Sequence, residues 1–271
     1  MTRKHGLPLF KPSHWLSILK TDNLKKPFNA IYNHHFNPAA KIKTLESLLT
    51  IFKREFGDEP CVISRAPGRI NIMGRHIDHQ GGCCNMMALA NDVYMVVGLR
   101  ERDRQVKVRN INPNLFQSED FYIDELLNET ALQNWIKFVD SDFVQRYNMV
   151  HQKKWSIYLK AIIARIQAAY PAVKLKGMNI AVAGDVPLAA GLSSSSTLVD
   201  ALGEAMTALN HIDISNQKFV ELCGEGEWFV GTRGGAGDHA AMKFSKKGKI
   251  VQLGFLPFSK MMEVNFPVDY S

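Results

Sequence analysis

The sequence lacks several features, and each absence removes a class of protein. No apolar run approaches the roughly 18–20 residues that a membrane-spanning helix needs. The first residues are basic and lead into a short stretch interrupted by proline, which is not typical of a secretory signal. Internal repeats and low-complexity tracts are missing too. We therefore expect a cytoplasmic protein that does not enter a membrane.

Cysteine is scarce. The chain has four cysteines, Cys61, Cys83, Cys84 and Cys223, and they form neither a C-x-x-C pair nor a zinc-ligand spacing. Cys83 and Cys84 are adjacent, and the side chains of neighbouring residues diverge too far for an unstrained disulfide. We expect reduced thiols, which agrees with an intracellular protein.

The charge is only moderately one-sided. The chain has 33 Lys and Arg against 26 Asp and Glu, a formal net charge of +7. The basic residues are spread along the chain, without a basic helix or an aromatic and glycine-rich RNA-binding motif. A positive surface also attracts small anions such as nucleotides. We expect no nucleic-acid partner, and the sequence does not indicate an oligomeric state.

What remains is an ordinary globular composition, 46% hydrophobic over 271 residues, which is enough for a full core. Helical and strand patterns alternate irregularly, which predicts an α+β fold with a mixed β-sheet packed with helices. From residue 44 a helical stripe runs to Gly57. The aromatic and basic residues 1–43 predict an N-terminal extension on a body that covers residues 44–271.

Local patterns predict further elements of this body. Strands are expected at 61–64, 93–99 and 178–182, a half-exposed strand around Val106 and Val108, a turn at 66–68, helices near 155–166 and 216–230, and a hairpin over 243–255 that turns at 247–249.

A serine run is the strongest local signal. Residues 185–197 read DVPLAAGLSSSST, and apolar residues then recur at helical spacing. The first turn of a helix has unpaired N–H groups and a positive dipole end. Small residues let a phosphate chain approach these groups, and serine hydroxyls can donate to it or ligate magnesium. The Walker A lysine is absent. The alternative is a helix that is merely well capped by serine.

A second segment is dense in hydrogen-bonding groups. Residues 65–82 read RAPGRINIMGRHIDHQGG. Carboxylates accept hydrogen bonds from vicinal hydroxyls and imidazole can donate or accept, so the loop suits a polyhydroxylated ligand. A metal site of His76, Asp78 and His79 is an alternative, although these side chains diverge on most backbones and no fourth ligand is near. A solvated turn is another.

The third segment, residues 230–239, reads VGTRGGAGDH. An aspartate after a glycine cluster is more often a turn former. Beside a phosphate cradle and a hydroxyl-binding loop, however, Asp238 can take a proton. The three segments together indicate a kinase that acts on a small alcohol, in which the protein mainly positions groups and neutralises charge.

These segments resemble those of the GHMP small-molecule kinases, most of all the galactokinases. The family's first motif is GRVNLIGEHTDY, and residues 68–79 read GRINIMGRHIDH. Its second motif, VPxGxGLSSS, matches residues 186–195, with Ala189 where glycine is usual. The galactokinase segment CGIMDQ matches residues 234–239 loosely, and a tryptophan-led helix start matches 155–160.

The resemblance covers about residues 45–260 and implies a GHMP-kinase N-terminal domain that binds sugar and ATP. It also implies that the C-terminal domain is largely absent from this chain, of which only the start is expected near residue 271.

The resemblance also implies roles for single residues. Asp238 would activate the anomeric hydroxyl and Arg69 would stabilise the transferred phosphoryl group. ATP and Mg²⁺ would be the cofactors, with Ser195 and Glu227 near the metal. The sugar would contact Arg75, His76, Asp78 and Gly82, and ATP would contact Gly191, Leu192, Ser193, Ser194, Ser195 and Ser196.

Two departures from the family pattern bear on these roles. Arg75 stands where galactokinases have a glutamate, and a cation there would pair with a carboxylate. Residues 76–82 also resemble those of plant galacturonate kinases, so galacturonate competes with galactose as the expected monosaccharide. Gly226 occupies the position of the family's acidic magnesium ligand, so Glu225 or Glu227 would have to bind the magnesium instead.

The predicted activity is ATP-dependent phosphorylation of the C1 hydroxyl of a galactose-type sugar. Catalytically inactive sugar and nucleotide binding, or a truncated kinase fragment, is the alternative. A mevalonate type of kinase would have little use for His76 and Asp78 together.

Overall fold

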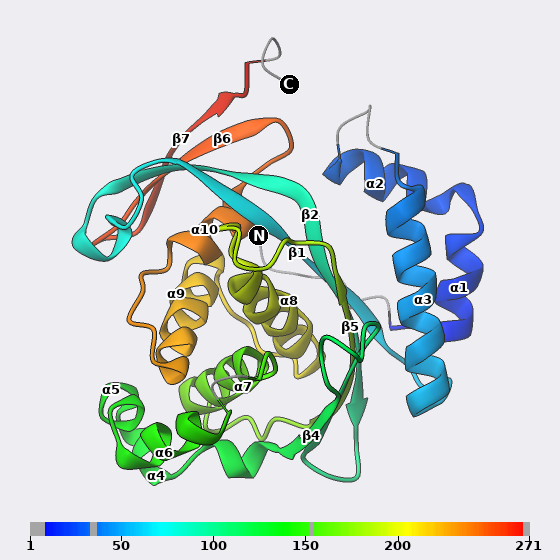
Figure 1. Cartoon of the computed structure of the whole chain (residues 1–271), viewed down its shortest axis with the longest axis horizontal. Helices are drawn as coiled ribbons and strands as arrows, with labels where there is room; N and C mark the ends of the chain where they lie inside the picture. The colour runs from blue at the N-terminus through cyan, green and yellow to red at the C-terminus, as the bar shows by residue number, and fades with distance from the viewer. Residues whose placement is uncertain (1–8, 33–36, 152–153, 268–271) are drawn as a thin grey trace.

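A mixed β-sheet separates two layers of helices in the computed structural model, which describes residues 9–32, 37–151 and 154–267 (Figure 1). The strands are β1 (Val62–Met73), β2 (Cys83–Arg100), β3 (Gln105–Asn110), β4 (Glu119–Tyr122), β5 (Gly177–Gly184), β6 (Lys249–Gly254) and β7 (Ser259–Asn265). The helices are α1 (Pro12–Leu19), α2 (Lys25–Ile31), α3 (Ala39–Phe56), α4 (Glu129–Gln133), α5 (Trp135–Val139), α6 (Asp142–His151), α7 (Ile157–Ala169), α8 (Ser194–Leu209), α9 (Asn216–Glu227) and α10 (Gly237–Phe244).

The long strand β2 organises the sheet. The strand order is β4-β3-β5-β2-β6-β7, and β1 pairs with β2 beside this path. β2 is antiparallel to β1, β5 and β6, whereas β3 and β5 run parallel. The mixed sheet and the α+β class are therefore confirmed.

Both faces of β2 are covered, which explains its continuous apolar run. Met95 and Val97 pack into the main core with α7 and α8, while Tyr94 and Val96 face a second core formed with α1–α3. A strand buried on both faces needs apolar residues at every position rather than at alternate ones.

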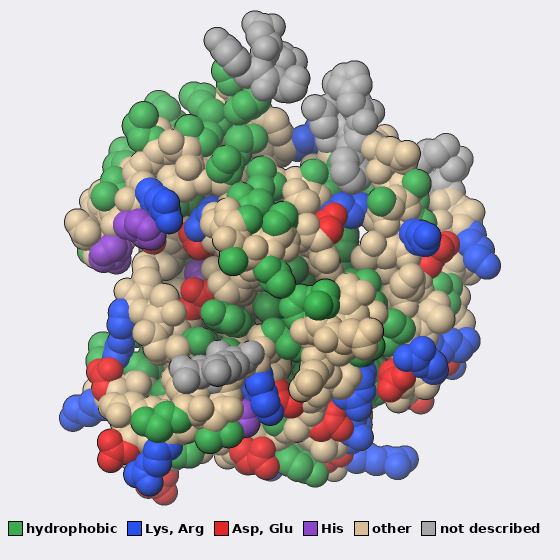
Figure 2. Space-filling view, viewed as in Figure 1, with side chains coloured by type: hydrophobic (Ala, Val, Ile, Leu, Met, Phe, Trp, Pro, Cys, Tyr) green, Lys and Arg blue, Asp and Glu red, His purple; other side chains and the backbone are tan. Residues whose placement is uncertain are grey.

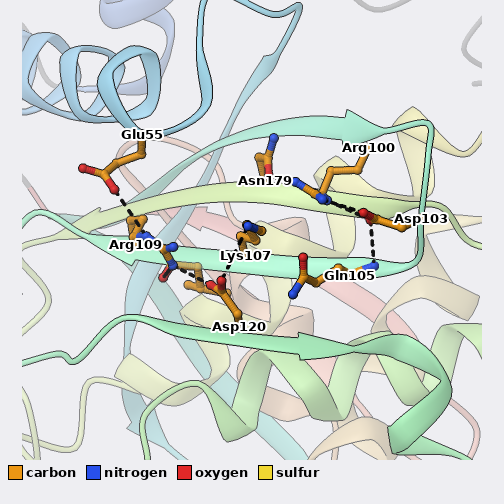
Figure 3. A network of polar contacts seen from close by, with 9 residues as sticks. Glu55, Arg100, Asp103, Gln105, Lys107, Arg109, Asp120 and Asn179 are labelled. Carbon is orange, nitrogen blue, oxygen red and sulfur yellow. Dashed lines mark hydrogen bonds and ion pairs between the residues drawn. The ribbon is translucent and has the colours of Figure 1, made fainter.

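Strand β3, which lies next to the edge strand β4, is different because it buries only one face. Val106 and Val108 are fully buried, and Lys107 and Arg109 lie on the other face, as the alternating pattern predicted. Arg109 Nη1 lies 2.6 Å from Asp120 Oδ1, and its Nε lies 3.5 Å from a carboxylate oxygen of Glu55 on α3 (Figure 3). This polar network attaches α3 to β3.

The N-terminal helices are integral to this arrangement. Helix α3 begins at Ala39 and ends at Phe56, and the predicted terminator Gly57 is its C-cap, with φ 87°. The expected boundary between residues 43 and 44 therefore falls inside α3. Leu48, Leu49 and Phe52 of the same helix are fully buried in the second core. Residues 39–43 thus continue a helix of the body.

Two local predictions were wrong. The turn expected at 66–68 does not occur, because β1 continues through it as an edge strand, where proline is tolerated. The hairpin expected over 243–255 is also wrong: Lys243 belongs to α10, and β6 instead pairs with β7. The apolar residues before Lys243 are buried on the core face of α10, so tertiary packing decides their structure.

No helix in the described ranges is both long and apolar enough to cross a membrane. All four cysteines are free thiols, as expected.

Candidate active site

Three segments that are far apart in the sequence meet at Asp238, which lies in the first turn of α10. Its Oδ1 accepts a hydrogen bond from Arg69 Nε at 2.7 Å and lies 2.6 Å from Arg69 Nη2. Its Oδ2 accepts a hydrogen bond from the Ser193 hydroxyl. The Asp238 side chain is 31% exposed, so the carboxylate remains accessible from one side.

A β-bulge aims Arg69 at this site. In a regular strand Arg65 and Arg69 would lie on the same face, because side chains alternate with a period of two. The register with β2 shifts between Pro67 and Arg69, so Arg65 pairs opposite Tyr94 and Arg69 opposite Ala88, on the side of α10.

The loop before α8 is held against β1 at the same point. Arg69 Nη1 donates to the Gly191 carbonyl at 2.6 Å, and the Arg69 backbone N–H donates to the Leu192 carbonyl at 3.3 Å. A Cβ on Gly68 would lie 3.3 Å from the Leu192 carbonyl oxygen, so the two backbones approach as closely as glycine allows.

The serine run begins α8 in an unusual conformation. Ser193 has φ 59° and makes no side-chain capping bond, because its hydroxyl donates to Asp238 instead. Ala189 and Gly191 also have positive φ, of 54° and 72°, which is a strained conformation for alanine and serine. The alternative that the serine run only caps the helix therefore does not describe this segment, because the Ser193 side chain makes no capping bond. The N–H groups of the first turn from Ser194 onward have no partner within the helix by its geometry.

The acidic residue at the end of α9 contacts the serine run. The Ser196 hydroxyl donates to Glu227 Oε1 at 2.8 Å, while the Ser195 hydroxyl shares a hydrogen bond with Tyr158 of α7. Burial raises the pKa of Glu227, against the opposing effects of His239 and Ser196. The structure thus brings Glu227 to Ser196 rather than to Ser195, the partner expected from the sequence.

These groups fit a magnesium ion in their chemistry. Hydroxyl and carboxylate oxygens, which Ser196 and Glu227 supply beside Asp238, are the donors that Mg²⁺ prefers. Glu225, the other candidate, is paired with Arg165 of α7 at 2.7 Å. The structure therefore favours Glu227 over Glu225.

Asp78, on the loop between β1 and β2, lies directly against the start of α10. Its Oδ2 accepts a hydrogen bond from the Gly237 backbone N–H at 3.0 Å. A Cβ on Gly235 would lie 2.3 Å from the same oxygen, and one on Gly237 would lie 2.8 Å from it. The glycine cluster before Asp238 thus makes room for Asp78.

The other residues predicted to bind sugar, Arg75, His76 and Gly82, lie on the same loop. Arg75 and His76 are exposed, and the Arg75 side chain makes no hydrogen bond or ion pair with any described residue. Gly82 packs against Ile77, whose side chain would be 2.7 Å from an added Cβ. Figure 2 shows basic and histidine side chains at the left of the molecule, above a hollow with acidic side chains inside.

The alternative metal site of His76, Asp78 and His79 is not supported. The one set of three side chains among the described residues whose ligand atoms lie close enough for a metal is Asp200, Cys223 and His239. The His79 Nδ1 lies 3.7 Å from Asp78 Oδ1.

Sequence reasoning missed that buried set. His239 Nδ1 lies 2.6 Å from Asp200 Oδ1, and its Nε2 lies 3.8 Å from Glu227 Oε1. Burial alone would lower the pKa of His239, but the carboxylates of Asp200 and Glu227 raise it to about 9. The available signal was an aspartate within the apolar pattern of the helix after the serine run.

A cavity of about 350 Å³ opens where α7 begins. Helix α7 also carries Tyr158, which contacts Ser195. The lining residues are Asn114, Leu115, Gln117, Ser118, Glu119, Lys154, Trp155 and Ser156.

Two family models match the chain. The galactokinase galactose-binding signature matches residues 50–99, which include β1, the loop and most of β2. The GHMP kinases N terminal domain matches residues 157–246, from α7 to the end of α10. The two matches contain the segments that meet at Asp238, and they confirm the resemblance found in the sequence.

Curated relatives carry the same family name. A galactokinase of Schizosaccharomyces pombe is 30% identical over 241 residues, which is 85% of this chain and 43% of the relative. A galactokinase of Halalkalibacterium halodurans is 31% identical over 209 residues, 74% of this chain and 46% of the relative. The chain thus spans about half the length of the curated relatives it matches.

Solved structures agree on the fold. The crystal structure of Lactococcus lactis galactokinase complexed with galactose has a TM-score of 0.65 and 24% identity, covering 85% of this chain and 52% of that one. Methanococcus jannaschii mevalonate kinase has a TM-score of 0.53 and 15% identity, covering 74% and 56%. The predicted GHMP N-terminal fold is therefore confirmed.

Proposed function

We propose, from the premise that this chain belongs to the GHMP kinase family and carries the galactokinase signature, that it transfers a phosphoryl group from ATP to the C1 hydroxyl of a galactose-type sugar. One observation carries the proposal. Asp238, Arg69 and Ser193 meet beside Asp78, so a proton acceptor, a cation, a helix N-terminus and a hydroxyl-binding carboxylate share one site.

In this reaction Asp238 accepts the proton of the C1 hydroxyl, in the place of the hydrogen bond it now takes from Ser193. The sugar oxygen attacks the γ-phosphorus, and the bond from that phosphorus to the β–γ bridging oxygen breaks, which releases ADP. Arg69 holds the Asp238 carboxylate in position, and its guanidinium offers positive charge to the transferred group.

The nucleotide would lie along the start of α8. Its phosphates would accept hydrogen bonds from the loop and first turn over residues 189–196. Mg²⁺, when bound, neutralises phosphate charge; Glu227 would hold it, together with Ser195 or Ser196. The cavity lined by Trp155 opens where α7 begins, and Tyr158 of that helix contacts Ser195, so we assign the adenine to this cavity.

The sugar would lie against Asp78 and the neighbouring residues of the loop between β1 and β2. Asp78 would accept hydrogen bonds from ring hydroxyls, with His76 and Gly82 beside it. Arg75 is exposed, and its charge is not neutralised by any partner in the part of the chain that the structure describes. A sugar carboxylate would pair with this guanidinium, which favours galacturonate over galactose.

A coupled ADP-release assay with galactose and with galacturonate tests the proposal. ADP release that depends on the sugar supports kinase activity, and faster turnover of galacturonate supports the role of Arg75. A clear preference for galactose overturns that role. Calorimetry with ATP and sugar covers the alternative: binding of both without ADP release would identify a binding module instead of an enzyme.

A further inference from the structure

A chain of buried polar side chains lies directly behind the candidate metal ligands. Asp200 of α8 and His239 of α10 are hydrogen-bonded at 2.6 Å, and both are buried, with His239 fully so. On its other side the imidazole faces Glu227 of α9. Glu227 in turn accepts the hydrogen bond from Ser196. The imidazole therefore stands between two carboxylates on three helices.

One nitrogen of this imidazole has no hydrogen-bond partner within the described residues. His239 Nε2 is buried and lies 3.8 Å from Glu227 Oε1, which is too long for a hydrogen bond but within reach of an ion pair. A histidine that only joined α8 to α10 would need Nδ1 alone, and an unsatisfied buried nitrogen costs about 1–3 kcal/mol. The orientation toward Glu227 is explained if Nε2 acts on that carboxylate.

The same side chains do not form a metal site of their own. Asp200, Cys223 and His239 lie close together, but the 2.6 Å between His239 Nδ1 and Asp200 Oδ1 is a hydrogen-bond distance. A metal ion bound by both atoms would need about 2 Å to each, which pushes the two ligands farther apart.

We propose that Asp200 and His239 are positioning residues, which direct the Glu227 carboxylate toward Ser196 and the divalent cation that accompanies the nucleotide. This inference rests on the proposed function, because it needs a cation at Glu227. Asp200 fixes the imidazole ring through Nδ1, and Nε2 places its partial positive charge behind Glu227. Neither residue touches the reacting atoms.

Binding of Mn²⁺ in the presence of ATP, measured from the electron paramagnetic resonance signal of the free ion, tests this role without requiring turnover. His239→Gln keeps a polar side chain but removes the imidazole, and we expect it to weaken Mn²⁺ binding about tenfold or more, as for other groups that orient metal ligands. Cys223→Ser is the matched control. Cys223 contacts Asp200 but not His239 Nε2, so the serine variant should bind Mn²⁺ like the wild type.

A double variant separates positioning from folding. Asp200→Asn with His239→Gln replaces the pair by two neutral amides that can still hydrogen-bond, so it avoids an unpaired buried carboxylate if the single variant fails to fold. Weak Mn²⁺ binding in this folded double variant supports the proposal, and wild-type binding overturns it. If the wild type itself binds no Mn²⁺ with ATP, the proposed function fails as well. If the wild type binds Mn²⁺ with ATP and His239→Gln binds it equally well, only the positioning role is overturned.

Discussion

Strand β1 carries two arginine–aspartate pairs that have opposite surroundings. Arg65 Nη2 lies 2.5 Å from Asp92 Oδ1, and Asp92 is 0% exposed. Arg69 lies 2.6 Å from Asp238, whose side chain is 31% exposed. Three residues and one bulge separate the two arginines, and the bulge sends them to opposite faces of the sheet.

The neighbours of each aspartate show what the difference means. Asp92 also accepts a hydrogen bond from Tyr32 and lies 3.0 Å from Lys41 Nζ, so two cations and a phenol contact its buried carboxylate. Asp238 has Arg69 and the Ser193 hydroxyl on one side and open space on the other. The first pair can only stabilise the fold, whereas the second retains a carboxylate that a substrate can reach.

Asp238→Asn gives the largest expected effect on activity. Loss of the proton acceptor should lower the rate of ADP release by about a thousandfold. The thermal midpoint should stay close to that of the wild type, because the side chain is partly exposed. A variant that turns over at the full rate would remove Asp238 from the mechanism.

Asp92→Asn should have the reverse effect. It leaves Arg65 and Lys41 facing a neutral side chain in a buried site, and breaking such a pair costs about 4 kcal/mol. Urea unfolding measures this loss directly. The folded fraction of Asp92→Asn should still bind nucleotide. An unchanged unfolding midpoint would contradict the structural role of the Arg65–Asp92 pair.

A third carboxylate, Glu119, extends the comparison to pH. Burial alone would raise its pKa, but hydrogen bonds from Lys160, Ser156 and Lys154 outweigh burial and lower the pKa from 4.5 to about 2. Because the pKa is lower in the folded state, the stabilisation is present above about pH 4.5 and is lost as the pH falls toward 2. Its size is up to about 3 kcal/mol.

The unfolding free energy of Glu119→Gln should therefore depend less on pH than that of the wild type between pH 5 and pH 2, where urea unfolding of both proteins gives the difference. Parallel pH profiles would show that the ion pairs of Glu119 add nothing to stability.

Gly68→Ala should have the smallest effect and probes the bulge itself. The added Cβ would lie 3.3 Å from the Leu192 carbonyl oxygen, so the loop before α8 must shift by a few tenths of an ångström. We expect a loss of about 1 kcal/mol in stability and a larger relative loss in nucleotide affinity, measured by calorimetry. Equal affinity with reduced stability would mean that the close contact serves packing only.

The sequence motifs predicted which residues meet at the site, but they could not predict the backbone geometry that brings them together. The glycines before Asp238 and the serine run indicated close approach to a ligand, and both segments do lie together. The face of the sheet on which Arg69 lies depends on a register shift between β1 and β2, and the residue pattern of β1 does not reveal this shift. Regular alternation would have placed Arg69 with Arg65, on the face of the N-terminal helices.

The missed features share a physical cause, since each depends on packing between distant elements. Lys41 was counted with an extension, yet its amine lies 2.6 Å from Asp185, the first residue of the segment that leads to the serine run. The Asp200–His239 pair needs α8 and α10 side by side, and β7 had no recognisable pattern apart from its pairing with β6.

The bond from the Gly237 backbone to Asp78 has a consequence for selectivity. Asp78 packs so closely against Gly235 and Gly237 that the loop proposed to bind the sugar and the turn that carries Asp238 must move together. A sugar of the wrong shape that displaces the loop also displaces the proton acceptor by a similar amount. Such a molecule would still bind, but it would be misaligned for transfer, so discrimination would be seen in kcat more than in KM.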